Sequence, residues 1–312
     1  MDGKFKIAVL GIGGVGGYIG GKLAGCYFNS TDKEIIFIAR GENQQQIKSL
    51  GLKLVTDEGE QIVHPPSVKS TPSPQDSFDL VICTVKSYDL QRSIELWKTV
   101  FSENTVIIPF LNGVDARDRI KKILPIADVW NGCIYIVSRL ISPGTVKVTG
   151  SLSKAYFGSD SASKEKLKMI ENIFKNAGIN AQLSQNIDFE VWRKFFFISP
   201  LATITSFLDT PVGGIINHIE KRKLLRNLLE ELKIVADAIG ITFEDSIIEK
   251  TLSRFEALPQ ETTSSMHDDF KKGKKTELNS LTGYVVSLAE KLNAEVPTYK
   301  RMFTELNNKA QK

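Results

Sequence analysis

Apolar and polar positions follow one pattern in the first half of the chain and another after about residue 185. In the first half, short runs that are apolar at nearly every position are separated by segments with helical spacing. Such runs are typical of strands covered on both faces in a parallel sheet. After about residue 185, apolar residues recur at helical spacing almost to the end. The pattern predicts an α/β part followed by a helical part.

The bounds of the expected elements follow from these runs. Strands are expected at 6–12, 34–40, 78–86 and 104–112, with a glycine-rich helix at 16–28 and a hairpin at 52–65 that turns at Glu58-Gly59. A meander is expected at 128–150 and 154–159, followed by an amphipathic helix at 163–178. In the helical part we expect helices at 188–208, 221–240, 245–257, 276–293 and 298–309.

The first expected strand runs into a GxGxxG pattern that opens a helix, which is the context this pattern needs to bind a dinucleotide. Gly11 allows the tight turn, Gly13 lets the backbone approach a pyrophosphate, and Gly16 lets the helix pack closely on the sheet. The alternative is a tight turn without a ligand. We predict a Rossmann-type dinucleotide-binding domain at 1–185, followed by an all-α domain at 186–312. The expected cofactor-binding residues of the turn are Gly11, Gly13, Gly14, Val15 and Gly16.

The end of the second strand indicates which dinucleotide binds. Enzymes that use NAD usually carry an acidic residue there, which accepts hydrogen bonds from the ribose 2′-OH. This strand ends in Arg40, whose guanidinium can pair with a 2′-phosphate. The sequence therefore favours NADP(H), with a solvent-facing arginine as the alternative.

Two polar residues end the next expected strands, Lys86 in VICTVKSYD and Asn112 in IIPFLNGVD. Ligands of open α/β sheets bind at the carboxyl ends of the strands, so both are candidates for the cofactor and substrate site. Each also has a structural explanation, because Ser87 or Asp89 could cap a helix and Asn112-Gly113 could form a turn.

Composition excludes several functions. The net charge of +4 is small and the lysines are scattered, which does not indicate a nucleic-acid surface. No apolar run reaches the length of about 20 residues that spans a bilayer. The three cysteines are far apart and the three histidines dispersed, so we expect reduced thiols, a cytoplasmic protein and no metal site.

The helical part carries two unusual segments. In VWRKFFFIS, Arg193 and Lys194 lie within a very apolar stretch, so Lys194 either extends along the apolar surface to water or points at a ligand. The segment 261–283 has few large apolar residues but contains Ser264-Ser265 and Glu277. At least one serine suits a helix amino terminus, and Glu277 suits a first turn.

Together, the glycine pattern, TVKSYD, LNGV, VWRKF and SSMHDDFKKGKKTE resemble the ketopantoate reductase (2-dehydropantoate 2-reductase) family over essentially the whole chain. The resemblance implies a Rossmann domain, an all-helical carboxyl-terminal domain, and NADPH-dependent reduction of ketopantoate to pantoate in pantothenate biosynthesis. It implies that Lys194 is the general acid, that Glu277 completes the polar site, and that Ser265 binds substrate. Lys86, Asn112 and Lys194 would also line the substrate site, and Arg40 would contact the 2′-phosphate.

The chain departs from the family at three substrate-contacting asparagines, which are replaced by Ile198, Ala202 and Thr262. Ser199, Thr203 or Thr205 could compensate. Three alternatives stay open: a reductase of another small branched 2-oxo acid, an inactive NADP(H)-sensing protein, and a dehydrogenase of the 6-phosphogluconate or glycerol-3-phosphate type. The last fits poorly, because a substrate phosphate needs more cations. The expected partner is a small 2-oxo acid, without nucleic acid or membrane, and a homodimer stays open.

Overall fold

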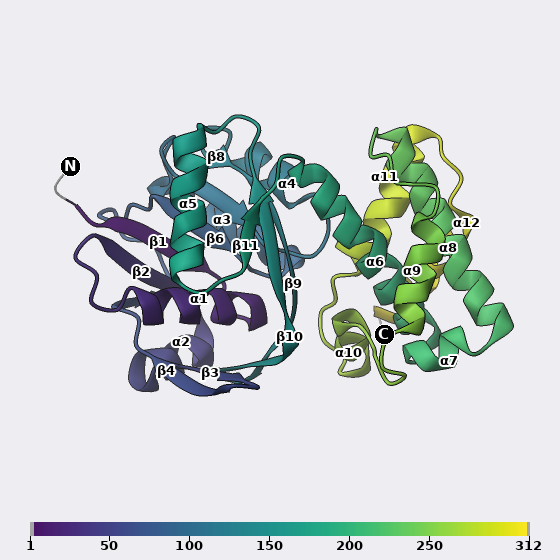
Figure 1. The fold of residues 1–312 in the computed structure, drawn as a ribbon, viewed down its shortest axis with the longest axis horizontal. Coiled ribbons are helices and arrows are strands. Elements are labelled where there is room, and N and C mark those ends of the chain that lie inside the picture. Colours follow the sequence, from purple (N-terminus) through teal and green to yellow (C-terminus); the bar gives the residue numbers. More distant parts are fainter. Residues whose placement is uncertain (1–2, 311–312) are drawn as a thin grey trace. The chain divides into compact units, whose positions relative to one another are not determined.

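A computed structural model describes residues 3–310 of the chain, whose elements are labelled in Figure 1. The chain folds into two compact units. The α/β unit comprises the chain up to Leu111 together with Asp115–Val191, and the helical unit comprises Asn112–Val114 and the chain from Trp192 onward. Their order confirms the predicted fold class, whereas the domain boundary expected after residue 185 stays a prediction.

The α/β unit is built on a parallel sheet with the strand order β5-β2-β1-β6-β7-β8. This is the order of a doubly wound dinucleotide-binding sheet, in which the first strand lies at the centre. The strands are β1 (Phe5–Leu10), β2 (Lys33–Ile38), β5 (Ser67–Lys69), β6 (Leu80–Cys83), β7 (Val106–Pro109) and β8 (Asp128–Val129).

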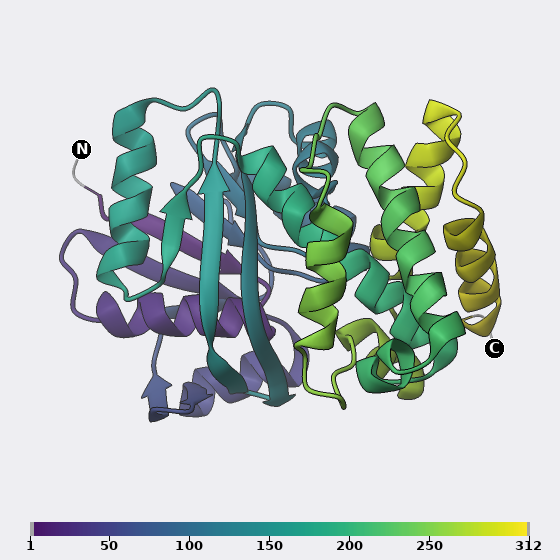
Figure 2. The same cartoon turned by 45° about the vertical axis from the view of Figure 1, so that its right-hand side comes forward.

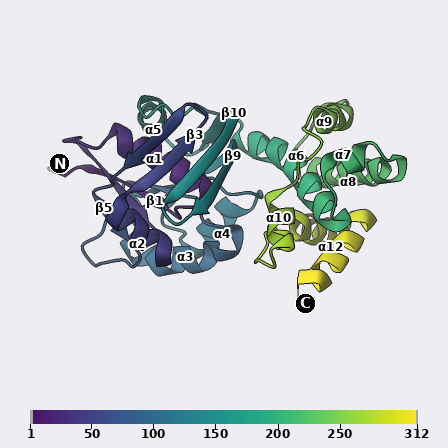
Figure 3. The same cartoon turned by 90° about the horizontal axis from the view of Figure 1, so that it is seen from below.

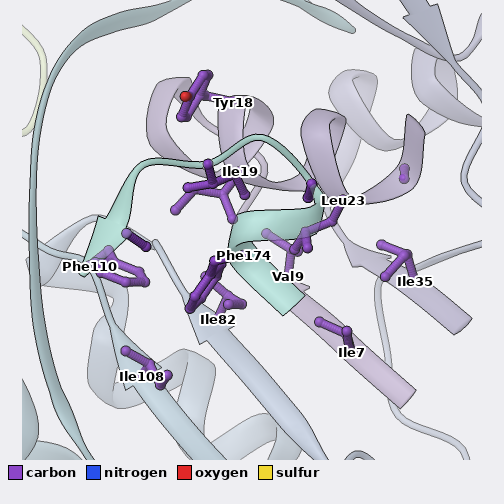
Figure 4. Packing of buried hydrophobic residues seen from close by; sticks show 14 of the residues in the cluster. Ile7, Val9, Tyr18, Ile19, Leu23, Ile35, Ile82, Ile108, Phe110 and Phe174 are labelled. Atoms are coloured by element: carbon purple, nitrogen blue, oxygen red, sulfur yellow. The ribbon is translucent and has the colours of Figure 1, made fainter. Parts of the chain in front are cut away.

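Both faces of this sheet are covered, which explains why its strands are apolar throughout. On β1, Ile7 and Val9 belong to one buried cluster and Ala8 and Leu10 to another. The first cluster includes residues of α1 (Gly14–Cys26), α2 (Gly41–Leu50) and α5 (Lys164–Asn176), and Figure 4 shows its packing. The second includes residues of α3 (Leu90–Trp97) and α4 (Ala116–Ile123), which contact each other (Figure 3). The short helices η1 (Ser87–Asp89) and η2 (Lys98–Val100) flank α3.

A second sheet in the same unit contains β3 (Leu52–Thr56), β4 (Gly59–Val63), β9 (Asn131–Ser142), β10 (Thr145–Gly158) and β11 (Ala181–Leu183). The hairpin predicted at 52–65 is confirmed, because β3 and β4 pair antiparallel with Thr56 opposite Gly59. Its turn lies at Asp57-Glu58, one residue earlier than expected, since Gly59 already pairs in β4. The expected meander is instead one long hairpin of β9 and β10, two teal strands in Figure 2. Its turn uses Gly144 at φ 73°, a conformation that suits glycine.

The helical unit begins within α6 (Ile187–Leu208) and is centred on α8 (Ile219–Ala238). Helix α8 contacts four other helices: α7 (Val212–Ile216), α9 (Ile247–Glu256), α11 (Tyr284–Leu292) and α12 (Pro297–Ala310). The buried Glu231 on α8 accepts hydrogen bonds from the backbone of Thr298 and Tyr299 at 2.8 and 2.9 Å. A carboxylate there stabilises the amino terminus of α12.

The remaining elements are α10 (Ser265–Lys271) and the π-helical segment η3 (Asn279–Gly283). The helix predicted at 276–293 therefore begins with a π-helical stretch before α11 follows. No helix in residues 3–310 combines the length and the apolar composition that a membrane crossing requires. The same residues hold no group of three or more His, Cys, Asp or Glu side chains suited to a metal ion.

Candidate functional site

The glycine turn between β1 and α1 has the geometry that its sequence predicts. Gly11 has φ 96°, and a Cβ atom there would lie 2.8 Å from Val85 Cγ1. A Cβ atom on Gly16 would lie 1.9 Å from the Gly11 carbonyl oxygen. A Cβ atom on Gly13 would instead meet nothing within 4 Å. Gly11 and Gly16 are thus required by the fold, whereas Gly13 leaves space beside the amino terminus of α1.

That space suits an anion. The first N–H groups of a helix have no partner within the helix, and the helix dipole places partial positive charge there. The first turn of α1 contains no acidic residue, and its N-cap residue is Gly13, which has no side chain that could cap the helix. Gly14 and Val15 open the helix, and a Cβ atom on Gly14 would lie 2.4 Å from the Ser138 carbonyl oxygen. The residues of this turn fit a dinucleotide pyrophosphate.

Two side chains that the sequence analysis did not single out hold this turn. Thr84 Oγ1, one residue past β6, donates a hydrogen bond to the Gly11 carbonyl at 2.6 Å. Asn43 Nδ2, in the first turn of α2, donates to the Ile12 carbonyl at 2.7 Å. Nothing in the local pattern marks either residue, because each contact joins segments that are distant in sequence. The neighbouring Cys83 thiol is inert, since burial raises its pKa to about 12.

Arg40 follows β2 and is the N-cap residue of α2, with a side chain 60% exposed. Its guanidinium forms an ion pair with the Asp89 carboxylate, which lies at the end of η1. Asp89 is the N-cap residue of α3 but makes no capping hydrogen bond with its side chain. Arg40 lies two residues past Ile38, whose carbonyl accepts from the Gly11 N–H at 3.0 Å. An exposed guanidinium at this place in the chain fits a 2′-phosphate, although that phosphate would share Arg40 with an acidic partner.

Lys86 and Asn112 each lie three residues beyond a strand end instead of at it, because β6 ends at Cys83 and β7 at Pro109. These two strands are neighbours, with Cys83 opposite Pro109. Lys86 is exposed and is the N-cap residue of η1. Asn112 belongs by its contacts to the helical unit.

In the helical unit, Asn112 lies between two buried charged groups. Lys194 Nζ donates a hydrogen bond to Asn112 Oδ1 at 2.9 Å. Asn112 Nδ2 contacts Glu277 Oε2 at 3.4 Å, which is a long hydrogen bond. Lys194 is 8% exposed and Glu277 is 4% exposed. Buried charges are costly unless they have polar partners, so three segments far apart in sequence form one polar cluster here.

Helix α6 presents Lys194 from an apolar environment, next to the buried Phe195 and Phe196, whereas Arg193 is half-buried. The start of this helix is held by Asp188, whose carboxylate forms a bidentate ion pair with the Arg117 guanidinium at 2.7 and 3.0 Å. The helix continues through Pro200 to Leu208 as one element.

The hydroxyls of Ser199, Thr203 and Thr205, considered above as substitutes for the missing asparagines, bind other partners. Ser199 Oγ donates to the Leu281 carbonyl at 2.9 Å and lies 2.8 Å from the Tyr299 hydroxyl. The Thr203 hydroxyl lies 2.8 Å from that of Thr282, and Thr205 Oγ1 lies 2.9 Å from Ser264 Oγ. All three residues are fully buried, so they connect helices within the core of the helical unit.

The serine pair divides its roles at the start of α10. Ser264 is the N-cap residue, and its Oγ accepts a hydrogen bond from the backbone N–H of His267 at 3.0 Å. Ser265, the first helical residue, is exposed. The predicted capping role therefore belongs to Ser264, and the Ser265 side chain is not needed for it. His267 is buried and its Nε2 lies 2.6 Å from Asp209 Oδ1, which ties α10 to the segment after α6.

The doubly wound sheet, its glycine turn and the helical unit that follows define a class of protein, the Rossmann-like dinucleotide-binding proteins with a helical carboxyl-terminal part. Two family models match the chain: "Ketopantoate reductase PanE/ApbA" over residues 7–161 and "Ketopantoate reductase PanE/ApbA C terminal" over residues 186–310. The chain belongs to the ketopantoate reductase family.

Individual relatives agree with this assignment over the whole chain. The 2-dehydropantoate 2-reductase structure from Porphyromonas gingivalis W83 is 32% identical, has a TM-score of 0.84, and matches 97% of this chain and 99% of its own. An uncharacterized oxidoreductase of Bacillus subtilis, YkpB, is 28% identical over 96% of this chain and 97% of its own. A 2-dehydropantoate 2-reductase of Streptococcus pyogenes is 26% identical over 93% and 95%.

A further structural relative shares only the fold. The D-mandelate dehydrogenase solved with NADH and anilino(oxo)acetate is 22% identical, with a TM-score of 0.86, and matches 98% of each chain.

Proposed function

We propose that this protein reduces 2-dehydropantoate to pantoate with NADPH, a step of pantothenate biosynthesis. The observation that carries the proposal is the buried cluster of Lys194, Asn112 and Glu277, in a chain of this family. An ammonium group held by polar partners in an apolar setting is suited to a reaction in which negative charge develops on an oxygen.

Lys194 is the proton donor in this proposal. A reduced nicotinamide held at the glycine turn would supply hydride to the carbonyl carbon, and the electron pair of the C=O bond would then move onto the oxygen. The Lys194 ammonium stabilises that charge and gives its proton to the oxygen, which becomes the hydroxyl of the product. The surrounding apolar side chains exclude water, which strengthens the interaction between the ammonium and the oxygen.

Asn112 and Glu277 support the lysine. The amide oxygen of Asn112 accepts from Lys194 Nζ, which restricts where the ammonium can point. The Glu277 carboxylate, reached through Asn112, opposes the loss of the positive charge that burial favours. Ser265, whose side chain is not needed for capping, is the proposed hydrogen-bond donor to the substrate. Lys86 and Asn112 are the other residues proposed to make polar contacts with the substrate.

The cofactor is proposed to bind with its pyrophosphate at Gly11, Gly13, Gly14, Val15 and Gly16 and its 2′-phosphate at Arg40. The open space at Gly13 and the exposed guanidinium of Arg40 support this assignment. NADH is the alternative, since Asp89 already engages Arg40 and a protein of the same fold was solved with NADH.

The preferred substrate depends on α6, where Ile198 and Ala202 stand at positions at which the family carries asparagines. Another small 2-oxo acid with a bulkier apolar group is therefore the second candidate. A cofactor-binding protein without turnover is the third, and the intact lysine cluster disfavours it.

Turnover with a panel of substrates tests these candidates. Oxidation of NADPH and of NADH is followed with 2-dehydropantoate, with other branched 2-oxo acids and with an aromatic 2-oxo acid. The proposal expects the highest kcat/KM with 2-dehydropantoate and NADPH. A higher value for another 2-oxo acid would replace the substrate, and tight NADPH binding without turnover on any of them would favour the binding protein.

Two properties of the molecule in the cell belong to the same proposal. None of the three cysteines, all within residues 3–310, forms a disulfide, and we propose a reducing, cytoplasmic location. We also propose a homodimer, the form named for a Staphylococcus aureus ketopantoate reductase of the same fold at 21% identity. Sedimentation of the purified chain at several concentrations would test this assembly.

A further inference from the structure

One amide connects the glycine turn to two other segments of the α/β unit. Asn43 Nδ2, on α2, donates to the Ile12 carbonyl of the turn at 2.7 Å. Asn43 Oδ1 accepts from the backbone N–H of Gly144, between β9 and β10, also at 2.7 Å. One partner can only accept and the other can only donate, so together they fix the orientation of the amide.

The bond to Ile12 determines where the next N–H group points. The Ile12 carbonyl and the Gly13 N–H belong to one planar peptide unit, and residues 3–310 contain no cis peptide bond. In a trans peptide these two groups point in opposite directions. Because Asn43 holds the Ile12 carbonyl toward α2, the Gly13 N–H points away from α2. Gly13 is the N-cap residue of α1, and the space at its Cα is open.

We infer that Asn43 is a positioning residue for the cofactor pyrophosphate: it orients the Ile12–Gly13 peptide so that the Gly13 N–H is directed at the phosphate oxygens. The inference rests on the proposed dinucleotide function of the turn. Its physical basis is preorganisation, because a peptide already held in the binding orientation loses little freedom when the anion arrives. The second bond, from Gly144, prevents the amide from rotating away from Ile12.

This role differs from that of Arg40, which lies at the start of the same helix. Arg40 is proposed to recognise the 2′-phosphate, which NADPH carries and NADH and ADP-ribose lack. Asn43 acts through the backbone that faces the pyrophosphate, which NADPH, NADH and ADP-ribose share. Loss of Asn43 should therefore weaken all three ligands by the same factor. It should leave unchanged the binding of adenosine 2′-phosphate, which has no pyrophosphate.

Two variants separate the bonds. Asn43→Ala removes both contacts without adding charge. Asn43→Asp has nearly the same shape and can still accept from Gly144, but it cannot donate to Ile12. It is therefore the variant that perturbs folding less. Gln45→Glu, at an exposed position of the same helix, controls for the added negative charge.

Dissociation constants are measured by titration calorimetry for NADPH, NADH, ADP-ribose and adenosine 2′-phosphate, with the melting temperature of each variant alongside. We expect both Asn43 variants to raise the first three constants by about tenfold, equal within about twofold, as loss of one well-aligned hydrogen bond implies. The fourth constant and those of Gln45→Glu should not change.

Three outcomes would overturn the inference. Unchanged NADPH affinity in a folded Asn43→Asp protein would show that the amide does not orient the turn. An equal loss for adenosine 2′-phosphate would assign Asn43 a purely structural role. Failure of the unaltered protein to bind any of the dinucleotides would reject the proposed cofactor site itself, and with it this role for Asn43.

Discussion

The glycine turn of the α/β unit and the lysine cluster of the helical unit are built in different ways. The turn uses neighbouring residues, and its surface is mainly backbone. The cluster brings together side chains at positions 112, 194 and 277, each from a different part of the chain. A backbone site depends only on the few side chains that orient its peptide groups, whereas a cluster of buried polar groups depends on every member.

In the proposed function, this difference separates cofactor binding from chemistry. The turn offers N–H groups and a helix dipole to any dinucleotide, so it defines a class of cofactor more than a reaction. The lysine cluster offers an ionisable group, which a hydride transfer to a ketone requires. Variants of the two regions should therefore change different measurements, and the following predictions are ordered from the largest expected effect to the smallest.

Replacing Lys194 should have the largest effect. Lys194→Ala removes the proposed proton donor and should lower kcat by about 10²- to 10⁴-fold, the range for a general acid. The dissociation constant of NADPH should change little, because the proposed cofactor contacts lie on other residues. Steady-state rates and NADPH titrations measure the two quantities.

The matched control for Lys194 is Lys300→Ala, which removes the same charge from an exposed position of α12. It should leave both quantities unchanged. Normal turnover by a folded Lys194→Ala protein would reject the general-acid role. Equal losses of turnover and NADPH affinity would show that the lysine cluster also contributes to cofactor binding.

Alanine substitutions at two glycines of the turn should affect different quantities, NADPH affinity at Gly13 and stability at Gly16. Gly13→Ala adds a methyl group to open space at φ −95°, so stability should fall by less than about 1 kcal/mol, while NADPH should bind at least about tenfold more weakly. Gly16→Ala forces a methyl group against the Gly11 carbonyl and should cost about 1–3 kcal/mol of stability or more. Urea unfolding and NADPH titration distinguish them; a strongly destabilised Gly13→Ala would mean that Gly13 serves the fold.

The two regions also differ in how far the sequence predicts them. The turn and the hairpin at 52–65 follow from local patterns, because their residues are near neighbours in sequence. The strand order of the sheet was not predicted, since it pairs β1 with β6 and β2 with β5, which are distant in sequence. For the lysine cluster, only the resemblance to a family predicted that Lys194 and Glu277 belong to one site. Apolar spacing alone left open whether Lys194 reaches water, since its contact with Asn112 spans 82 residues.

Other features depended wholly on tertiary contacts. Neither Asn43 nor Thr84 breaks the pattern of its segment, and the ion pair of Arg40 with Asp89 spans 49 residues. The strands after which Lys86 and Asn112 lie also end earlier than their apolar runs do, because the chain leaves the sheet before the apolar residues stop.

Arg40 tests whether the α/β unit recognises more than a pyrophosphate. Arg40→Ala should weaken NADPH by about 10- to 100-fold, the value of charge-assisted hydrogen bonds, and NADH by much less. Arg92→Ala, which removes an exposed arginine of α3, is the control. Equal losses for the two cofactors would show that Arg40 does not recognise the 2′-phosphate.

Asp89 refines the same test. Because its carboxylate pairs with Arg40, Asp89→Asn should release the guanidinium and remove a negative charge near the 2′-phosphate. NADPH should bind about two- to fivefold more tightly, in line with the small free energy of an exposed ion pair. Weaker NADPH binding by Asp89→Asn would mean instead that Asp89 holds Arg40 in its binding position.

The smallest effect concerns pH and the segment that carries Ser265. The hydrogen bond with His267 holds the pKa of Asp209 below its usual value. A carboxyl group whose pKa is depressed by folding contributes stability above its unfolded pKa of about 3.9, and this stability is lost as pH falls through the folded pKa.

Asp209 has φ 48°, which asparagine also tolerates, so Asp209→Asn removes the titration without adding strain. Its unfolding free energy should decline less than that of the unaltered protein between about pH 5 and 3. Asp245→Asn, at an exposed site, is the control, and its unfolding free energy should depend on pH as that of the unaltered protein does. Identical pH dependence for all three proteins would show that the Asp209–His267 hydrogen bond does not stabilise the fold in a pH-dependent way.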